Sequence, residues 1–433
     1  MKDNEFKKLD KWIIKIEDRA REFGLKFRAQ NFTVCSAEKM LEKEAQLGGY
    51  DLYSHWSFGK RFAKSKTLYT YKYHFLPYEM VINTDPCDAC LLDSNPLTYN
   101  LLVAAHVYGH NDFFCNNLMF KDTEPKYIQM YLREGGRRIE EYIRNPRIGL
   151  ENVESLLDAA HAVWMINDSA GRSFLDFVLR DFEHLSDYER DILKTVDTWS
   201  RHVRGNMKTK VMNEGWATYW HWKIVESFSS EIKSEFGPSA YVDEMLEMHR
   251  GVVRLPNNLK SLNPYRVGLL TWEKIWNDLM WNQKFSPVDF FNIRAGKTDV
   301  EFISEHFRGE PLIYEKFLKP ILKANGVSQK IDVAGETEKY RKMIIGSCGE
   351  ILIPRFNFYI DKTPSGRSLM LIHVFDGREL ERGVILHNTV KLIHRIWPGE
   401  IILKTVGSEK GGKKNIALVW RNGEFQKIEM PAS

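Results

Sequence analysis

The sequence has few cysteines and no apolar run long enough to suggest a membrane protein. Its five cysteines (Cys35, Cys87, Cys90, Cys115 and Cys348) are odd in number and fit a reducing compartment better than a disulfide framework. The first residues, MKDNEFKKLDKWIIKIEDRAREFG, lack the apolar core of a signal peptide. No uninterrupted apolar stretch reaches the length of a membrane span. We therefore expect a cytoplasmic protein.

The chain also lacks a strong excess of either charge. Its 62 basic and 58 acidic residues give a net charge of +4, which is too small to indicate a nucleic-acid partner. The basic residues are spread along the chain, and no nucleic-acid-binding motif, internal repeat or low-complexity tract occurs. These absences argue against nucleic-acid binding and against a repeat architecture.

What the sequence does contain is enough apolar material for a large core. Apolar residues make up 43% of the chain and aromatic residues 13%, with 12 tryptophans. A chain of 433 residues is too long for one small core, so we expect one large domain or two unequal ones. The segment 324–337 is a candidate linker because its composition changes there. We predict a mainly α domain over residues 1–330 and a small α+β domain over residues 338–433.

Helical periodicity dominates the first part of the chain. The motif DSNPL predicts a helix that begins with Asn95 as its cap and Pro96 in its first turn, and that runs through His106 and His110 to about Asn116. Residues 46–63 are predicted to form a loop, and residues 78–83 a short extended or helical piece. Further helices are predicted at 6–23, 125–145, 149–167, 186–203, 208–228 and 263–280, the last opened by Asn263 and Pro264.

Strand-like patterns follow in the last part of the chain. They occur at 350–361, 368–376, 400–406 and 415–430, with a helical pattern at 384–397. Asn422-Gly423 is the type of dipeptide that joins two hairpin strands. The segment carries no motif with a chemical role, so we interpret it as an interaction or packing module.

The first chemical signal is AAHVYGHNDFF, residues 104–114, which places His106 and His110 four residues apart. This spacing puts two imidazoles on one face of a helix, where they can bind one metal ion. A shuffled chain of this composition would contain about 0.4 such pairs, so the spacing alone does not decide between a metal site and two buried histidines. Zinc peptidases carry a glutamate directly after the first histidine, and here that position is Val107.

A second predicted helix strengthens the metal interpretation. The segment VMNEGWATYWHW places Glu214 among apolar residues, where a carboxylate is costly to bury unless it is paired or bound to a cation. His221 lies seven residues further on, close to the same face. Gly215 and Ala217 are small, so another helix can approach closely. This is a zincin-like pairing of an HxxxH helix with a helix that supplies a glutamate; the alternative for Glu214 is an ion pair with a basic residue or a protonated histidine.

The general base of such a site is not identified by the sequence. Val107 cannot accept a proton, and Asp112 lies off the histidine face, where it is better placed to orient a ligand or to end the helix. Glu79 and Glu134 are other acids that could reach the site. Cys87 and Cys90 form a lone CxxC motif, which without a second pair is a weak metal or redox signal. His55, His161 and His249 are more typical of structural histidines than of ligands.

Several motifs in order identify a family. SHWSFGKRF, YEMVINTDPC, LLDSNP, AHVYGHNDFFCNN, YERDIL, TKVMNEGWATYWH and LNPYRVGL occur in sequence over about residues 8–325. Together they strongly resemble the SpoVR family, the stage V sporulation protein R proteins of bacteria. The motif positions that match are His55, Trp56, Gly59, Lys60, His106, His110, Asp112, Asn116, Asn117, Asn213, Glu214, Gly215, Trp216 and His221.

This resemblance implies a cytoplasmic protein linked to spore cortex formation in spore formers, with relatives in bacteria that form no spores. It also implies a stationary-phase or stress pathway with a PrkA-type serine kinase and a von Willebrand-A-like protein as candidate partners. The family's biochemical activity does not follow from the resemblance.

Combining the residues with the resemblance, we predict one divalent metal, zinc, bound by His106, His110 and Glu214. Asp112 and His221 are the predicted catalytic residues, Asp112 as an orienting group and His221 as a fourth ligand or a neighbour of the ligands. Amide or peptide-bond hydrolysis is the chemistry that such a site would perform. The competing hypothesis, favoured by Val107, is a catalytically silent scaffold in a kinase-linked complex.

Overall fold

The chain forms two compact units, and neither is continuous in sequence. Unit 1 comprises Met1–Tyr50, Trp56–Gln129 and His202–Leu352, and unit 2 comprises Asp51–His55, Met130–Arg201 and Ile353–Ser433. The sequence predicts two domains that meet near residues 330–338. Whether these two parts fold independently is not tested by the structure, so this division stays a prediction. The computed structural model describes residues 3–45, 53–71, 79–259, 261–281, 286–324, 332–349, 351–363, 366–381, 383–409, 412–421 and 423–428.

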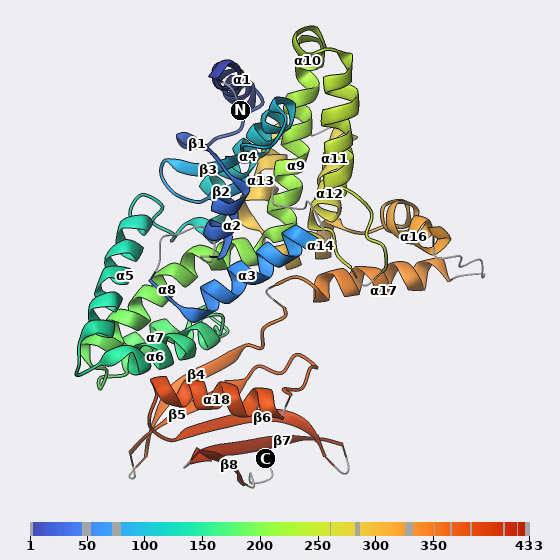
Figure 1. Cartoon of the computed structure of the whole chain (residues 1–433). Coiled ribbons are helices and arrows are strands. Elements are labelled where there is room, and N and C mark those ends of the chain that lie inside the picture. Colours follow the sequence, from blue (N-terminus) through green and yellow to red (C-terminus); the bar gives the residue numbers. More distant parts are fainter. Residues whose placement is uncertain are drawn as a thin grey trace. The chain divides into compact units, whose positions relative to one another are not determined.

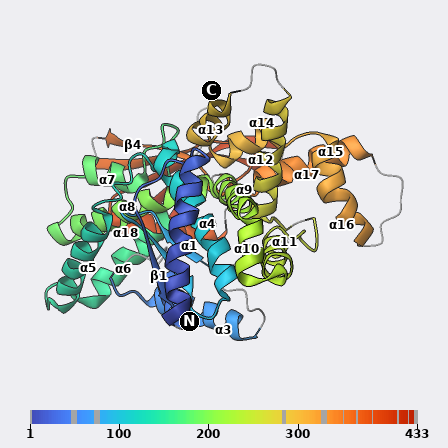
Figure 2. The same ribbon diagram turned by 90° about the horizontal axis from the view of Figure 1, so that it is seen from above.

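Three helices form the centre of unit 1: α4 (Leu97–Asn116), α9 (Lys210–Ser227) and α12 (Pro264–Met280) (Figures 1 and 2). Helix α9 packs against both α4 and α12, and α1 (Asp3–Glu22) packs against α4. Every residue of α4 from 100 to 114 is buried. A helix that is apolar on all sides belongs in a core, so α4 is held by neighbours on every side.

Shorter helices surround this centre. They are α2 (Ala37–Ala45), α3 (Trp56–Tyr71), α10 (Ser229–Phe236), α11 (Leu246–Val252), α13 (Pro287–Gly296), α14 (Asp299–His306), α15 (Glu310–Ile313), α16 (Lys319–Ala324) and α17 (Val333–Gly346), with single turns η1 (Leu118–Phe120), η2 (Ala240–Met245) and η3 (Tyr314–Leu318). None of the described helices combines the length and the apolar character that crossing a lipid bilayer requires.

Small residues let the central helices approach each other closely. An ideal Cβ at Gly109 on α4 would lie 2.6 Å from Cα of Ala217 on α9. On the other side of α9, an ideal Cβ at Gly215 would lie 2.3 Å from backbone atoms of Gly268 on α12. These distances are far below a normal carbon–carbon contact of about 3.5–4.0 Å. The prediction that Gly215 and Ala217 allow close helix approach is therefore confirmed.

Unit 1 also contains a small sheet in the order β1-β3-β2. Strand β3 (Cys87–Leu92) pairs in parallel with β1 (Gln30–Cys35) and antiparallel with β2 (Glu79–Ile82). Residues 79–82, predicted to be either extended or helical, are thus a strand, while Tyr78 lies outside the described residues. The sheet matters for the site because it places Glu79 at the start of β2.

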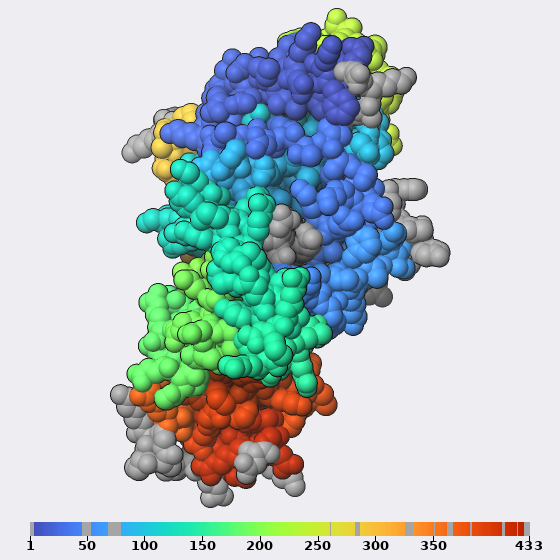
Figure 3. Space-filling model, turned by 60° about the vertical axis from the view of Figure 1, so that its left-hand side comes forward, coloured from blue at the N-terminus to red at the C-terminus, as the bar shows by residue number. Residues whose placement is uncertain are grey.

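Unit 2 combines helices with the C-terminal sheet. The sheet has the order β4-β5-β6-β7-β8, and its one parallel pair, β5 with β6, is joined through α18 (Val384–Ile396) (Figure 1). Figure 3 displays the green 130–201 segment and the red C-terminal residues as one continuous surface. The elements are α5 (Ile128–Arg144), α6 (Gly149–Val163), α7 (Phe174–Asp181), α8 (Asp187–Lys208), β4 (Phe356–Thr363), β5 (Gly366–His373), β6 (Ile401–Glu409), β7 (Gly412–Arg421) and β8 (Glu424–Ile428). Helix α8 ends in unit 1, and α5 begins there.

These elements confirm a mainly helical chain with a small C-terminal sheet. The pairing of Arg421 with Glu424 leaves two residues for the predicted hairpin turn, of which Asn422 lies outside the described residues. Asn263 caps α12 as predicted, because its side chain accepts a hydrogen bond from the backbone N–H of Arg266. The zincin-like character of the α4–α9 pair stays a prediction.

Three local predictions were wrong. The predicted loop 46–63 contains the first half of α3; its residues 46–52 lie outside the described residues. Asn95 does not cap α4: the helix begins at Leu97, Pro96 precedes it, and the Asn95 amide donates to Asn100 instead. The predicted linker 324–337 ends in helix, because Asp332 caps α17 through the N–H of Gly335; its residues 325–331 are outside the described part.

Candidate metal centre

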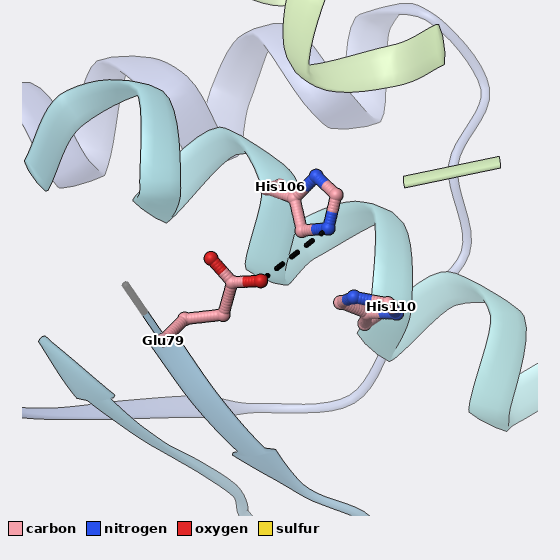
Figure 4. A group of neighbouring side chains, drawn as sticks. All are labelled: Glu79, His106 and His110. Carbon is pink, nitrogen blue, oxygen red and sulfur yellow. Dashed lines mark ion pairs between the residues drawn. The ribbon is translucent and has the colours of Figure 1, made fainter. Parts of the chain in front are cut away.

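The two histidines of α4 lie side by side at the centre of unit 1. The rings of His106 and His110 are 4.6 Å apart between centroids, as expected for side chains one helical turn apart. Both residues are buried, with 3% and 6% of their surface exposed. Figure 4 displays both rings on the side of α4 that faces Glu79 of β2.

Two carboxylates meet the histidines from different elements. Glu214 on α9 places Oε2 3.4 Å from Nε2 of His110 and 3.7 Å from Nε2 of His106. Glu79 on β2 places Oε1 3.6 Å from Nε2 of His106 (Figure 4). One ligand atom from each of Glu79, His106 and His110 lies within 4.8 Å of the others. The structure thus brings the predicted ligands His106, His110 and Glu214 together and adds Glu79, which the sequence offered only as a possible acid.

Hydrogen bonds on the far side of each ring fix which nitrogen faces the carboxylates. Nδ1 of His110 lies 2.9 Å from Oδ1 of Asn213, so this nitrogen carries the proton and donates it. Nδ1 of His106 lies 2.9 Å from Nδ1 of His221, and Nε2 of His221 lies 2.8 Å from Nδ1 of His249. The three rings allow this chain to run in either direction, and with protons on Nδ1 of His106 and Nε2 of His221 it runs towards His249. Both Nε2 lone pairs of the α4 histidines then point at the carboxylates.

The predicted role of His221 can now be compared with its position. His221 contacts the Nδ1 side of His106 and is 2% exposed. It is therefore placed to orient His106, one of the two alternatives that the sequence left open. Burial, with the neighbouring histidines, lowers its pKa well below the usual range, so the ring is neutral. Burial likewise lowers the pKa of His249 to about 4.

The charges at the centre are strongly coupled. Burial opposes the charged form of His110, but the carboxylates of Glu214 and Glu79 outweigh it and raise its pKa. Burial likewise opposes ionised Glu214, yet His106 and His110 outweigh it and hold its pKa well below the usual range. The carboxylates and the imidazoles of the centre therefore stabilise each other's charged forms.

Two buried atoms of this centre have no hydrogen-bond partner among the described residues: Nε2 of His106 and Oε2 of Glu214. Their separation of 3.7 Å is too long for a hydrogen bond. Two ligand atoms on one tetrahedral zinc ion, at about 2.0–2.1 Å each, lie about 3.3 Å apart. The observed separations of 3.4 to 3.7 Å are close to that spacing. Glu79, His106 and His110, with Glu214 close to both histidines, therefore form a group that could hold a metal ion.

Tyr265 at the start of α12 is a further member of the centre. Its ring centroid lies 6.0 Å from that of His106. Burial, with the charges of Glu214 and Glu79, raises the pKa of its hydroxyl well above the usual range, so it stays a neutral donor. Tyr265 belongs to the motif LNPYRVGL but was not predicted as a site residue. Nothing in the local sequence indicates that α12 brings it beside α4.

Asp112 does not join the histidines. Its Oδ2 accepts from Arg294 at 2.6 Å and from the indole of Trp216 at 2.8 Å, and its Oδ1 accepts from the backbone N–H of Lys26 at 2.7 Å. Arg294 and Asp112 form a buried ion pair, with side chains 6% and 0% exposed. The orienting partner of His110 is Asn213 and not Asp112. The contacts of Asp112 are those of a residue that ties α4 to α9, α13 and the N-terminal segment.

The other candidates are engaged in contacts of their own. Glu134 is paired with Arg137 and Arg138 on the surface of α5 in unit 2. Cys87 and Cys90 belong to different hydrophobic clusters on the two faces of β3, so the CxxC motif does not gather its thiols at one point.

Two further histidines belong to unit 2. His161 contacts the Tyr53 hydroxyl at 2.5 Å, and His55 lies 3.4 Å from Asp158. His55 is buried and His161 is partly buried, and both have the partnered surroundings that are typical of structural histidines.

Comparison with known proteins gives a consistent family assignment. A family model described as SpoVR like protein matches residues 3–173 and 165–343. The Uncharacterized protein YcgB of Escherichia coli (strain K12) is 26% identical over 476 residues, which cover 92% of this chain and 92% of that protein. No solved structure matches the chain. The family match contains β2, α4, α9, α11 and α12, so it includes every residue of the centre.

Proposed function

Because the chain belongs to the SpoVR family, we propose that its function depends on one divalent cation, zinc, held by His106, His110 and Glu214. The observation that carries this proposal is the convergence of the Nε2 atoms of two histidines and of two carboxylates in one pocket. Asn213 and His221 support it, because each occupies the Nδ1 atom of one histidine and leaves Nε2 for a cation. We assign Glu214 as the ligand because its Oε2 lies 3.7 and 3.4 Å from Nε2 of His106 and His110. Glu79, which also lies within 4.8 Å of both histidines, is assigned the role of base.

We infer further that the site hydrolyses amide or peptide bonds. A divalent cation held there would polarise an amide carbonyl and lower the pKa of a water molecule. Glu79 replaces the glutamate that zinc peptidases carry at the position of Val107. It takes a proton from water as the water oxygen bonds to the amide carbon, and it gives that proton to the leaving nitrogen as the C–N bond breaks. Tyr265 donates a hydrogen bond to the carbonyl oxygen, on which negative charge develops.

The substrates that we propose are amides of cell-wall precursors or of proteins, in sporulation or a stationary-phase stress response. The support is the family membership together with the chemistry of the centre. The partners that we propose are a PrkA-type serine kinase and a von Willebrand-A-like protein.

The first experiment measures metal in the purified protein by elemental analysis. We expect about one equivalent of zinc in the wild type, and its loss in His110→Ala and Glu214→Gln. His387→Ala, which removes an exposed histidine of α18, is the matched control and keeps the metal. A wild type that holds no metal, and whose unfolding temperature responds to neither zinc nor a chelator, contradicts the metal proposal.

A second experiment distinguishes a catalyst from a catalytically silent scaffold. The scaffold is the alternative that Val107 favours, because Val107 is fully buried and cannot act as a base. Glu79→Gln keeps the zinc ligands but removes the proposed base. We expect this variant to bind zinc, to lose amide hydrolysis and to fail in a sporulation or stress assay. Full complementation by Glu79→Gln would favour the scaffold hypothesis. That hypothesis also requires the Glu79→Gln variant to remain bound in the complex with the kinase.

A further inference from the structure

Two cavities adjoin the candidate metal centre. The first, of about 400 Å³, is lined by His110, Asn213, Glu214 and Lys210. The second, of about 790 Å³, is lined by His106 and by residues of α4, α11 and the following loop. Glu79 and Tyr265 line both, so the proposed base and the proposed donor stand where the cavities meet. We name them the Lys210 cavity and the Leu255 cavity.

The Lys210 cavity has the ammonium group of Lys210 at its wall. Lys210 is the first residue of α9 and lies one turn before Glu214, on the same face of the helix. A lysine at a helix N-terminus is unfavourable, because the helix dipole is positive there. Asp299 occupies the helix end itself, accepting from the N–H groups of Val211 and Met212 at 2.9 and 2.8 Å. Among the described residues no carboxylate forms an ion pair with Lys210, so it is available to an anionic ligand.

The Leu255 cavity is mainly apolar. Its walls include Leu102 and Val103 from the buried face of α4, Met248 from α11, and Leu255 and Leu262 from the loop before α12. Its volume of about 790 Å³ lies in the range of ordinary small-molecule sites. A bulky apolar side chain or acyl group would lose its water contacts here, and this burial favours binding.

We propose that the ligand is an extended peptide-like amide that carries a carboxylate on one side and a bulky apolar group on the other. The carboxylate pairs with Lys210, the apolar group enters the Leu255 cavity, and the amide between them lies over His106 and His110. This inference rests on the proposed function for the reaction at that amide. The preference for a carboxylate at one end and an apolar group at the other follows from the residues that line the two cavities. An acidic acyl-peptide is therefore preferred over a neutral or uniformly polar one.

The test measures binding with three synthetic tripeptides: N-acetyl-Leu-Ala-Ala as the free acid, its C-terminal carboxamide, and the free acid with glycine in place of leucine. Affinities are measured by calorimetry on the full chain, with zinc and after chelation. We expect the acid to bind about threefold to fivefold more tightly than the carboxamide, as for an exposed ion pair. The leucine peptide should bind about tenfold more tightly than the glycine peptide.

Variants assign each preference to one cavity. Lys210→Met should abolish the preference for the acid and keep the preference for leucine, whereas Lys223→Met, the matched change later in α9, should keep both. Leu255→Asn should abolish only the preference for leucine, and Leu262→Asn provides a second variant if the first does not fold. Thermal unfolding verifies that each variant is folded.

The outcomes separate this inference from the proposed function. If the acid preference survives Lys210→Met, if the leucine preference survives in the folded loop variants, or if the wild type binds none of the peptides, the inference is wrong. Zinc binding with no peptide preference leaves the metal proposal standing and refutes this one. Peptide preferences that follow the variants in a protein that takes up no added zinc refute the metal proposal and support this one.

Discussion

A single methyl group added at Gly109 tests whether the close approach of α4 and α9 builds the metal centre. In Gly109→Ala the new Cβ would lie 2.6 Å from Cα of Ala217, about 1 Å short of a normal carbon contact. The two helices must therefore separate by about 1 Å. Such overpacking costs about 1–3 kcal/mol, partly offset by the better helix propensity of alanine.

The same displacement acts on the proposed metal ligands. Glu214 is on α9 and the histidines are on α4, so a 3.4 Å separation between Glu214 and His110 would grow by a similar amount. One cation could then no longer hold all three groups at normal bond lengths, and we expect zinc affinity to fall about tenfold or more.

The assay combines urea unfolding of the chelated protein with a competitive zinc titration. Gly59→Ala in α3 is the matched control, because a Cβ there meets nothing within 4 Å. We expect the control to be stabilised by about 0.5–1 kcal/mol and to bind zinc normally. If Gly109→Ala is as stable as Gly59→Ala and binds zinc as tightly, the helix approach does not build the site.

Three further predictions follow from individual side chains. Asp112→Asn leaves Arg294 buried without its counter-charge, so we expect a loss of about 3–5 kcal/mol in urea unfolding with the zinc content unchanged. Asn213→Ala removes the group that orients His110 and should weaken zinc binding about tenfold to hundredfold in a chelator competition. His202 has its pKa lowered to about 4 by burial. Below about pH 6.5 this histidine therefore binds a proton in the unfolded chain but not in the folded chain. The free energy of unfolding keeps its full value above that pH and falls by up to about 3 kcal/mol towards pH 4. His202→Gln should flatten this dependence in unfolding curves measured between pH 4 and 7.

The sequence identified the parts of the centre that depend on helix periodicity. The spacing of His106 and His110 and the apolar surroundings of Glu214 are local features, and the structure brings these residues together. Glu79 could not be assigned in the same way, because its position depends on how β2 pairs with β3 and on how that sheet lies against α4. The ion pair of Asp112 could not be predicted for a related reason: its partner Arg294 is 182 residues away in the chain.

Local signals also failed where two of them competed. Asn95 before Pro96 has the form of a helix cap, but its amide is engaged by Asn100 and the helix begins one residue later. Glycine and aromatic residues in 46–63 suggested a loop, yet Trp56–Tyr71 is helical, so the glycine at position 59 is tolerated within a helix. The strands predicted in the C-terminal part agree better with the structure than the loop and the helix cap do. Alternating apolar residues and a hairpin turn are short-range features of the sequence.

The discontinuous units have a consequence for synthesis on the ribosome. Helix α4 is apolar on all sides, but α9, which covers one side of it, begins about 90 residues after α4 ends. At a translation rate of about 5–20 residues per second, α4 waits roughly 5–20 s for this partner. The 130–201 segment waits longer, for the C-terminal sheet that completes its unit. During these intervals the nascent chain exposes apolar surface, so its yield depends on chaperones that hold unfinished chains.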